Sequence, residues 1–341
     1  MYADKLALLP VNLRLFDSNT NVTTQTGEGQ DLSPEMKVYY SDYLIDNAMP
    51  KLVHDQFGQK RPIPKGKGKT IEFRKYSPLP KALTPLTEGV TPNGRKLNVS
   101  TLTAEVKQYG DYVELSDVLL LTAIDNNLVE ATKLLGAQAG QTLDTITREV
   151  LMGGTNVQYA AGEVNARNLL TGGAADGNHY LTVDAVRRAV RFLKNQNAEQ
   201  IDGSWVGIIH PDISYDLMND PEWKYPHQYQ DTTNLYEGEI GKIAGVRWVE
   251  TTEAKKFVGG GKDSRDVYAT LILGANAYGV TEIEGGGLQH IVKQLGSAGT
   301  ADPLNQRATA GWKAIKTAER LVEQFMVRVE TASTFSDGVA N

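Results

Sequence analysis

The chain has no cysteine and no long apolar run, and each absence excludes a class of protein. Without cysteine there can be no disulfide, no thiolate metal site and no cysteine nucleophile, which agrees with assembly in a reducing cytoplasm. Because no run of about 18 apolar residues occurs, we expect no membrane-spanning helix. The start of the sequence, Met1 to Lys5, lacks the charged and apolar regions of a secretory signal, so we expect none.

Motifs for metal binding and catalysis are also scarce. The histidines show neither His-x-x-x-His nor His-Glu-x-x-His spacing, so no zinc site is expected; they are His54, His179, His210, His227 and His290. No Gly-x-Ser-x-Gly elbow supports a serine hydrolase. Residues 66–70 resemble the end of a phosphate-binding loop, but Ile63 stands where the motif needs glycine, and a strand follows instead of a helix. We therefore expect no metal, no cofactor and no enzyme.

Two acidic residues, Asp212 and Asp216, lie one turn apart in a helix predicted to begin at His210-Pro211. Paired carboxylates can perform acid–base chemistry, but Asp212 is explained more simply by the positive end of the helix. The nearby aromatic residues favour a protein contact over stacking on bases or sugars; they are Tyr215, Tyr225, Tyr229, Tyr236 and Trp223. We interpret this segment as structural.

The chain of 341 residues exceeds the usual size of one compact core, so two lobes are expected. Helical and strand patterns are mixed, which predicts an α+β fold. Helices are predicted to begin at Ser33 and to cover residues 117–122, 128–152, 182–195 and 210–218. Strands are predicted over residues 69–76, 97–106, 204–209, 246–251, 267–273, 278–283, 288–295, 308–316 and 321–331. Residues 1–32 are interpreted as an extended arm, and residues 337–339 are expected to fray.

The helix over 128–152 carries the strongest helical signal. Its stripe at steps of three and four is formed by Leu128, Thr132, Leu135, Ala139, Leu143, Ile146 and Val150. At 1.5 Å per residue such a helix spans roughly 37 Å, enough to brace a whole domain.

Residues 58–100 form a basic and proline-rich segment. They hold ten lysines or arginines against two acids, so their net charge is +8 in a chain of −6, which leaves −14 elsewhere. Six of the 13 prolines lie here and favour an extended tip between two strands. Because a lone hairpin is only marginally stable, this loop needs a partner surface.

Nucleic acid and a neighbouring copy of the chain are both candidate partners for this loop. Its charge suits phosphate, but it has few aromatic residues for stacking on bases. The acidic remainder of the chain offers a complementary surface on a second copy. We propose that these cations make the contact: Lys65, Lys67, Lys69, Arg74, Lys75, Arg95 and Lys96.

Four stretches of the sequence carry a resemblance to a known family. They are residues 52–57 with 62–66 (LVHDQF and PIPKG), 84–92 (TPLTEGVTP), 110–117 (GDYVELSD) and 302–307 (DPLNQR). In these stretches the chain resembles the major capsid proteins of Enquatrovirus-type short-tailed bacteriophages, over about residues 30 to 335. The signatures are specific to a family and do not identify catalytic residues.

The resemblance implies the Hong Kong 97-like capsid fold, with an N-terminal arm, an extended β-loop, a peripheral domain with a long spine helix, and an axial domain. Mapped onto this sequence, the parts are the arm 1–32, a helix leading into the peripheral domain 33–57, the extended loop 58–108, the peripheral domain 109–199 with spine helix 128–152, the axial domain 200–290, and the return to the peripheral domain with the tail, 291–341. No Lys–Asn pair can be nominated for covalent crosslinking.

The function that the resemblance implies is that of a major capsid protein. Copies would form pentamers and hexamers that close into an icosahedral shell around double-stranded DNA, with assembly in the host bacterial cytoplasm. Expected partners are other copies, a portal, a scaffold, a decoration or cement protein, and packaged DNA bound without sequence preference. The alternatives are a nucleic-acid-binding protein that uses the loop 58–100, and an enzyme with a site in residues 200–290.

Overall fold

The computed structural model describes residues 20–21, 53–76, 79–91, 93–122, 127–160, 164–172, 179–223, 241–297 and 302–341. The helix predicted at Ser33 and most of the aromatic segment after Trp223 lie outside the described residues. The chain divides into two compact units. The first comprises residues 1–48, 110–137 and 288–313, and the second 49–109, 138–287 and 314–341.

The first unit is built on strands that pair with the two long strands β5 (Lys107–Ser116) and β14 (Arg307–Arg320). Strand β1 (Thr20–Asn21) runs parallel to β5, and β13 (Gln289–Lys293) runs antiparallel to β14. No strand was predicted over residues 110–116. They are part of β5, and a Cβ atom on Gly110 would lie 2.6 Å from the backbone oxygen of Trp312 in β14, so the two strands approach too closely for a side chain here.

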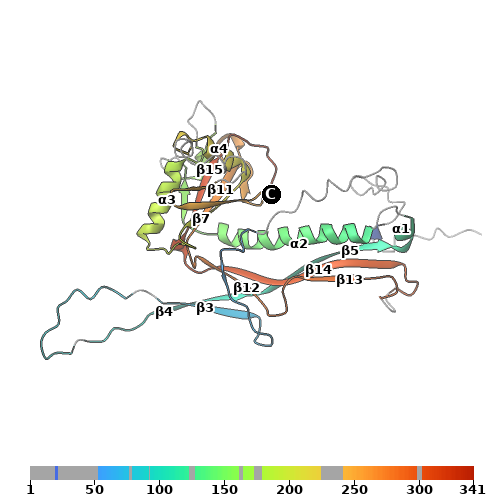
Figure 1. The fold of residues 1–341 in the computed structure, drawn as a ribbon, viewed down its shortest axis with the longest axis horizontal. Coiled ribbons are helices and arrows are strands. Elements are labelled where there is room, and N and C mark those ends of the chain that lie inside the picture. Colours follow the sequence, from blue (N-terminus) through green and yellow to red (C-terminus); the bar gives the residue numbers. More distant parts are fainter. Residues whose placement is uncertain are drawn as a thin grey trace, which may run out of the picture. The chain divides into compact units, whose positions relative to one another are not determined.

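Two helices follow β5, as the sequence predicted. Helix α1 covers Asp117–Thr122, and helix α2 covers Asn127–Met152 and continues into the second unit (Figure 1). Of the predicted stripe, Leu135, Ala139 and Leu143 are buried. Towards its C-terminal end α2 also buries polar residues that the stripe did not include, namely Asp144, Thr147 and Arg148.

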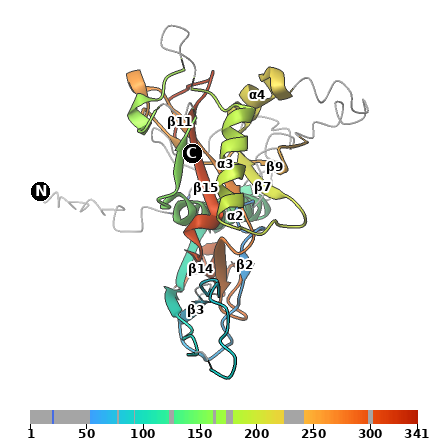
Figure 2. The ribbon, with the colours of Figure 1, turned by 90° about the vertical axis from the view of Figure 1, so that its left-hand side faces the viewer.

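The second unit contains a seven-stranded sheet (Figures 1 and 2). Its strand order is β6 (Val157–Tyr159), β15 (Met326–Ala332), β11 (Val267–Leu273), β7 (Trp205–Ile209), β9 (Val246–Glu250) and β8 (Lys242–Ile243), with β10 (Lys256–Phe257) paired to β11. Every residue of β7 and β11 is buried. Strands buried on both faces are read in sequence as continuous apolar runs, which is the pattern of these two segments.

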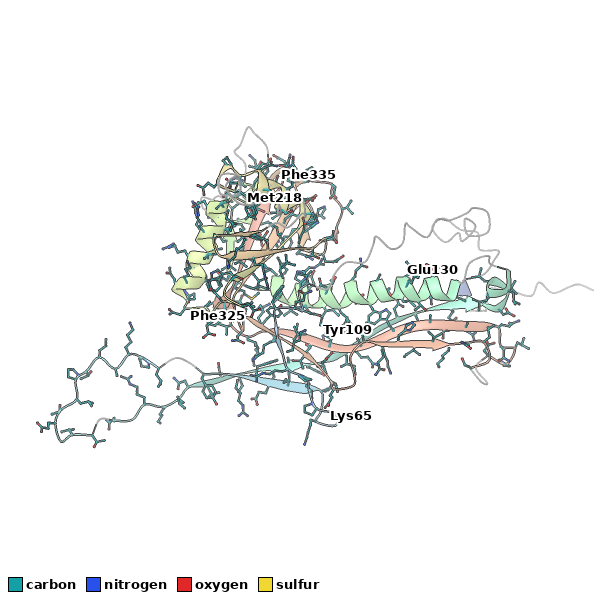
Figure 3. The ribbon with its side chains drawn as sticks, in the orientation of Figure 1. Lys65, Tyr109, Glu130, Met218, Phe325 and Phe335 are labelled. Atoms are coloured by element: carbon teal, nitrogen blue, oxygen red, sulfur yellow. The ribbon has the colours of Figure 1, made fainter. Side chains whose placement is uncertain are left out.

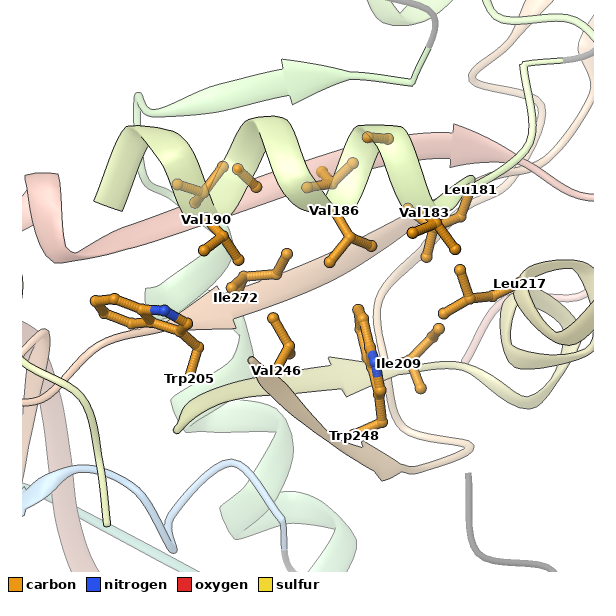
Figure 4. Close-up of a cluster of buried hydrophobic side chains, with 14 of the residues drawn as sticks. Leu181, Val183, Val186, Val190, Trp205, Ile209, Leu217, Val246, Trp248 and Ile272 are labelled. Carbon is orange, nitrogen blue, oxygen red and sulfur yellow. The ribbon is translucent and has the colours of Figure 1, made fainter. Parts of the chain in front are cut away.

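One face of this sheet packs against helix α3 (Val183–Asn195). Thr182 caps this helix, which was predicted over residues 182–195: its side chain accepts a hydrogen bond from the amide of Ala185. Figure 4 shows side chains of α3 facing those of the sheet: Val183, Val186 and Val190 against Trp205, Val246 and Ile272. The other face is formed by the alternate strand residues, such as Val206 and Ile208, and packs with Leu151 and Met152 of α2.

The remainder of the second unit carries the basic segment. Strand β12 (Tyr278–Glu282) pairs with the C-terminal part of β14 and, on its other edge, with β2 (Gln59–Lys60). Strands β3 (Thr70–Tyr76) and β4 (Val99–Glu105) form a separate antiparallel hairpin, which confirms the strands predicted at 69–76 and 97–106. Figure 1 shows the long loop that joins them.

Two predictions near the C-terminus are wrong. The strand predicted to end at residue 316 continues to Arg320, because residues 316–320 pair with β12, and the next strand starts only at Met326 after a 3-10 turn. The tail does not fray. The amide of Gly338 donates to Asp266 (2.8 Å), and the side chain of Asn341 donates to the oxygen of Thr252 (2.9 Å).

Candidate functional site

The basic segment starts from a fixed point on β12. Ile63 is buried and bridges to Ile283, with hydrogen bonds from its amide to the oxygen of Glu282 (2.8 Å) and from the amide of Glu284 to its own oxygen (2.9 Å). After it the chain turns at Gly66 and Gly68, whose φ angles are +80° and +90°. The turn leads into strand β3, as predicted, and not into a helix whose amides could bind phosphate.

The hairpin that follows has one buried side. Phe73 of β3 and Ala104 of β4 are buried, while most other described side chains of the two strands are exposed or half-buried. The register pairs Thr70 with Glu105 and Tyr76 with Val99. The two strands therefore act as a stem that is held by a few apolar contacts.

Beyond the stem, every described residue of the tip, 79–91 and 93–98, is exposed. The tip holds Leu83 and Leu86, whose exposed fractions are 82% and 77%, together with Val90 and Leu97. Figure 3 shows the side chains of this loop around its open curve, with Lys65 labelled at the turn before the stem. An exposed set of large apolar side chains on a charged loop is typical of a contact surface.

The seven predicted contact cations divide into groups. Lys69 pairs with Glu105 (2.5 Å) and Arg74 with Glu72 (3.4 Å), so these two already have acidic partners within the hairpin. The hydrogen bond between Lys69 and Glu105 raises the pKa of Lys69 and lowers the pKa of Glu105. The side chain of Lys75 lies outside the described residues.

The other four cations are exposed: Lys65, Lys67, Arg95 and Lys96. Among the residues that the structure describes, no carboxylate lies within 4.0 Å of their charged nitrogens. These four offer positive charge to a partner without first breaking an ion pair of their own.

The acidic pair Asp212 and Asp216 of helix α4 (Pro211–Asn219) is structural, as interpreted from the sequence. Asp212 accepts a hydrogen bond from the hydroxyl of Tyr268 (2.6 Å), and burial together with this bond raises the pKa of Tyr268. Asp216 accepts from the hydroxyl of Ser333 (2.8 Å) and the amide of Thr334 (3.0 Å). Both carboxylates thus accept hydrogen bonds from other parts of the fold.

His210 caps the start of α4, since its ring nitrogen accepts a hydrogen bond from the amide of Asp212 (3.2 Å). Burial lowers the pKa of His210, although Asp212 opposes this shift. In the described part of the chain no three His, Asp or Glu side chains gather as metal ligands would. Likewise, none of the described helices is long and apolar enough to cross a bilayer.

The apolar side chains of the loop were not singled out from the sequence. Their signal is present, because leucines and valines recur between Pro80 and Leu97 in a stretch whose prolines prevent a helix. An extended loop of this length cannot bury such side chains against itself. Their exposure in the structure therefore adds an apolar component to what the charges alone predicted.

Comparison with known proteins gives a family and a fold. A family model described as "Phage capsid protein" matches residues 122–296, slightly more than half of the chain. No curated protein matches. Similar solved structures include the capsid of cyanophage Pam1 (TM-score 0.64, 13% identity, covering 93% of this chain and 99% of that one) and the capsid of cyanophage P-SCSP1u (0.62, 13%, 91% and 93%). The capsid of Ralstonia phage GP4 is also similar (0.59, 15%, 94% and 100%).

At such low identity these structures establish the fold. The predicted α+β, Hong Kong 97-like capsid fold is thereby confirmed. The family is one of structural shell proteins and not of enzymes, and the nucleic-acid-binding alternative gains no support from it. Because the family model covers half of the sequence, the chain belongs to the phage capsid protein family and is a component of the virion shell.

Proposed function

We propose that the chain is the major capsid protein of a tailed bacteriophage, and that its copies form pentamers and hexamers that close into an icosahedral shell around double-stranded DNA. The observation that carries the proposal is a basic and apolar loop, exposed along its whole described tip, on a chain of the phage capsid family. Among the residues that the structure describes, none covers this tip, which therefore suits a neighbouring copy.

In this proposal the extended loop 58–108 binds to the neighbouring subunit. Lys65 at the turn and Lys96 on the returning side of the tip have no carboxylate partner among the described residues, and they face acidic groups of the neighbour. The residues of the neighbour outside this loop are strongly negative. Charge complementarity of this kind directs encounter and register more than it adds affinity. The apolar anchors Leu83 and Leu86 supply the affinity. Lys75 adds to the positive charge of the loop, whereas Lys69 and Arg74 already pair with Glu105 and Glu72 and contribute less.

The parts of the subunit follow the capsid map. Residues 1–32 form the arm, residues 33–57 lead into the peripheral domain, and α2 is the spine helix of that domain, 109–199. The axial domain is centred on residues 200–290. Helix α3 and strands β6 and β15 lie outside these bounds but share the sheet and core of β7 and β11, so we propose to move these three elements from the peripheral to the axial domain. The remaining residues from 291 onwards return to the peripheral domain.

The finer assignment is to the Enquatrovirus-type short-tailed phages, supported by the four sequence signatures, such as residues 84–92. Assembly takes place in the host bacterial cytoplasm. The further partners are a scaffold, a portal and a decoration or cement protein, and the packaged DNA touches the shell without sequence preference. Since the chain has no cysteine, its contacts do not include disulfides.

Sedimentation and negative-stain microscopy of the expressed protein test this proposal. The wild type is expected to give closed shells or rings of five and six subunits. Reversal of two unpaired cations, Lys65→Glu with Lys67→Glu, is expected to stop assembly while the subunit stays folded. The matched control is Arg191→Glu with Lys194→Glu on the exposed face of α3, which changes the charge equally outside the loop.

Normal particles from the Lys65/Lys67 variant would contradict the role of the loop charges. A wild-type protein that stays a dispersed monomer and shifts DNA with a steep salt dependence would overturn the proposal in favour of nucleic-acid binding.

A further inference from the structure

A buried polar cluster lies where the chain enters the basic segment. Asp144 of α2 is 1% exposed, and His54 is fully buried. A carboxylate in such a place is costly unless it is fully hydrogen-bonded. Asp144 meets this need with three partners: the amides of Val53 (3.0 Å) and His54 (2.8 Å) and the Nδ1 atom of His54 (2.7 Å).

A second contact lies one residue further along. Asp55 accepts a hydrogen bond from the hydroxyl of Thr147 (2.5 Å), which is on the same face of α2 as Asp144. Asp55 also forms an ion pair with Lys316 of β14, and Lys316 donates to the backbone oxygen of Leu143 (2.9 Å). Burial lowers the pKa of Lys316, while Asp55 and Asp144 oppose the shift. Residues 143–147 of α2 thus form hydrogen bonds with Asp55, with Lys316 and with the backbone of residues 53–54.

A third contact comes from β12. The hydroxyl of Tyr278 donates to the backbone oxygen of His54, and the ring of Tyr278 is itself 1% exposed. Residues 53–55 are therefore tied to α2, β12 and β14 at once. The whole cluster belongs to the second unit of the chain.

The chain has little freedom between this cluster and the loop. Only three residues separate Asp55 from β2, which pairs with β12. The amides of Arg61 and Ile63 then donate to the oxygens of Val280 (3.1 Å) and Glu282 (2.8 Å). The position of residues 53–55 consequently determines where β2 and the turn before β3 begin. Every described residue of the tip is exposed, and none of them makes a contact of this kind with another described part of the chain, so we infer that the direction of the tip depends on its root.

We propose that His54, Asp55, Asp144 and Lys316 are positioning residues for the loop: they anchor its root to helix α2 so that the tip is presented in one orientation to the neighbouring subunit. The intersubunit part of this inference rests on the proposed function of the loop. The anchoring part concerns one subunit alone and can be measured without assembly.

The first variant is Asp144→Ala, which leaves the amides of residues 53 and 54 and the ring of His54 without their acceptor. Its matched control is Asp216→Ala, which removes another buried, multiply hydrogen-bonded carboxylate of the same unit, one that holds Ser333 and Thr334 and not the loop. A milder variant, Thr147→Val, deletes only the bond to Asp55 and is used if Asp144→Ala does not fold.

Amide hydrogen exchange of Arg61 and Ile63 is the readout for anchoring, since these amides donate to Val280 and Glu282 and not to the substituted side chains. Relative to Asp216→Ala, exchange at these amides is expected to rise at least roughly tenfold in Asp144→Ala, and less in Thr147→Val. Equal exchange in Asp144→Ala and in the control would overturn the anchoring.

Particle yield tests whether the anchor orients the tip of the loop for contact with the neighbouring subunit. Asp144→Ala is expected to give far fewer particles than Asp216→Ala at the same concentration of folded subunit. If exchange rises locally but particle yield matches the control, the positioning role is overturned. If wild type and control also form no particles while the exchange pattern holds, the proposed function fails and the anchor stands.

Discussion

The apolar tip of the loop allows a prediction with a defined magnitude. Replacing Leu83 and Leu86 with alanine removes three apolar carbons from each side chain, and burial of a carbon contributes about 0.8 kcal/mol. Their exposed fractions of 82% and 77% show that nearly all of this burial is still to be gained in an interface. Ordering the two leucine side chains in the interface offsets part of this gain, so the double variant should lose about 2–3 kcal/mol per loop contact.

The isolated subunit should hardly change, because substitutions of exposed residues usually alter the free energy of unfolding by less than about 0.5 kcal/mol. Assembly should change greatly, since about 1.4 kcal/mol corresponds to a tenfold change in an equilibrium constant. The concentration at which particles first form is therefore expected to rise about 30- to 150-fold.

Two measurements separate these effects. Urea unfolding of dispersed subunits gives the free energy of unfolding, and sedimentation velocity over a concentration series gives the threshold for assembly. An unchanged threshold with an unchanged subunit would refute the interface role of the two leucines. A loss of subunit stability as large as the loss of assembly would show that these side chains support the fold instead.

Two further predictions concern the fold of the subunit. In Gly207→Ala the new Cβ would lie 2.5 Å from the ring of Trp248, so the free energy of unfolding should fall by about 1–3 kcal/mol. Gly136→Ala, with open space at an exposed helical site, should instead raise the free energy of unfolding by up to about 1 kcal/mol. Urea unfolding checks both values, and a Gly207→Ala variant as stable as the wild type would contradict the packing of β7. Burial opposes ionisation of Asp266, but hydrogen bonds from Gly338 and Gly259 outweigh it and hold the pKa of this carboxyl below 3.8. The stability that ionised Asp266 contributes is thus complete above about pH 4–5 and lost as the pH falls through its folded-state pKa. The difference in unfolding free energy between wild type and Asp266→Asn should therefore shrink from pH 7 to pH 2. A difference that does not change with pH would contradict this role.

Helices and strands that are determined by the pattern of their own residues were predicted correctly from the sequence. Periodicity predicted helix α2, and the sequence patterns also predicted helix α3 and the two hairpin strands. Elements that depend on distant partners were missed. Strand β14 continues to Arg320 because β12, some 40 residues earlier, pairs with it, and the tail is held by Asp266, about 70 residues before Gly338.

The site divides in the same way. Composition and charge located the basic loop, but the hairpin register decides which cations remain unpaired, because it places Glu105 beside Lys69. The anchoring cluster could not be predicted, since Asp144 lies 90 residues after His54 and a carboxylate beside the apolar stripe of α2 gives no indication of its partner. The close approach of β5 and β14 at Gly110 depends on tertiary contact in the same way.

The central claim is that the loop of one subunit contacts the next in a closed shell. A cryo-electron microscopy reconstruction of particles assembled from the wild-type protein tests it most directly. The prediction is density for residues 79–98 across an adjacent subunit, with Leu83 and Leu86 buried and Lys65 near an acidic side chain of that subunit. A shell in which this loop contacts only its own subunit, or a protein that forms no shell under any assembly condition, would contradict the claim.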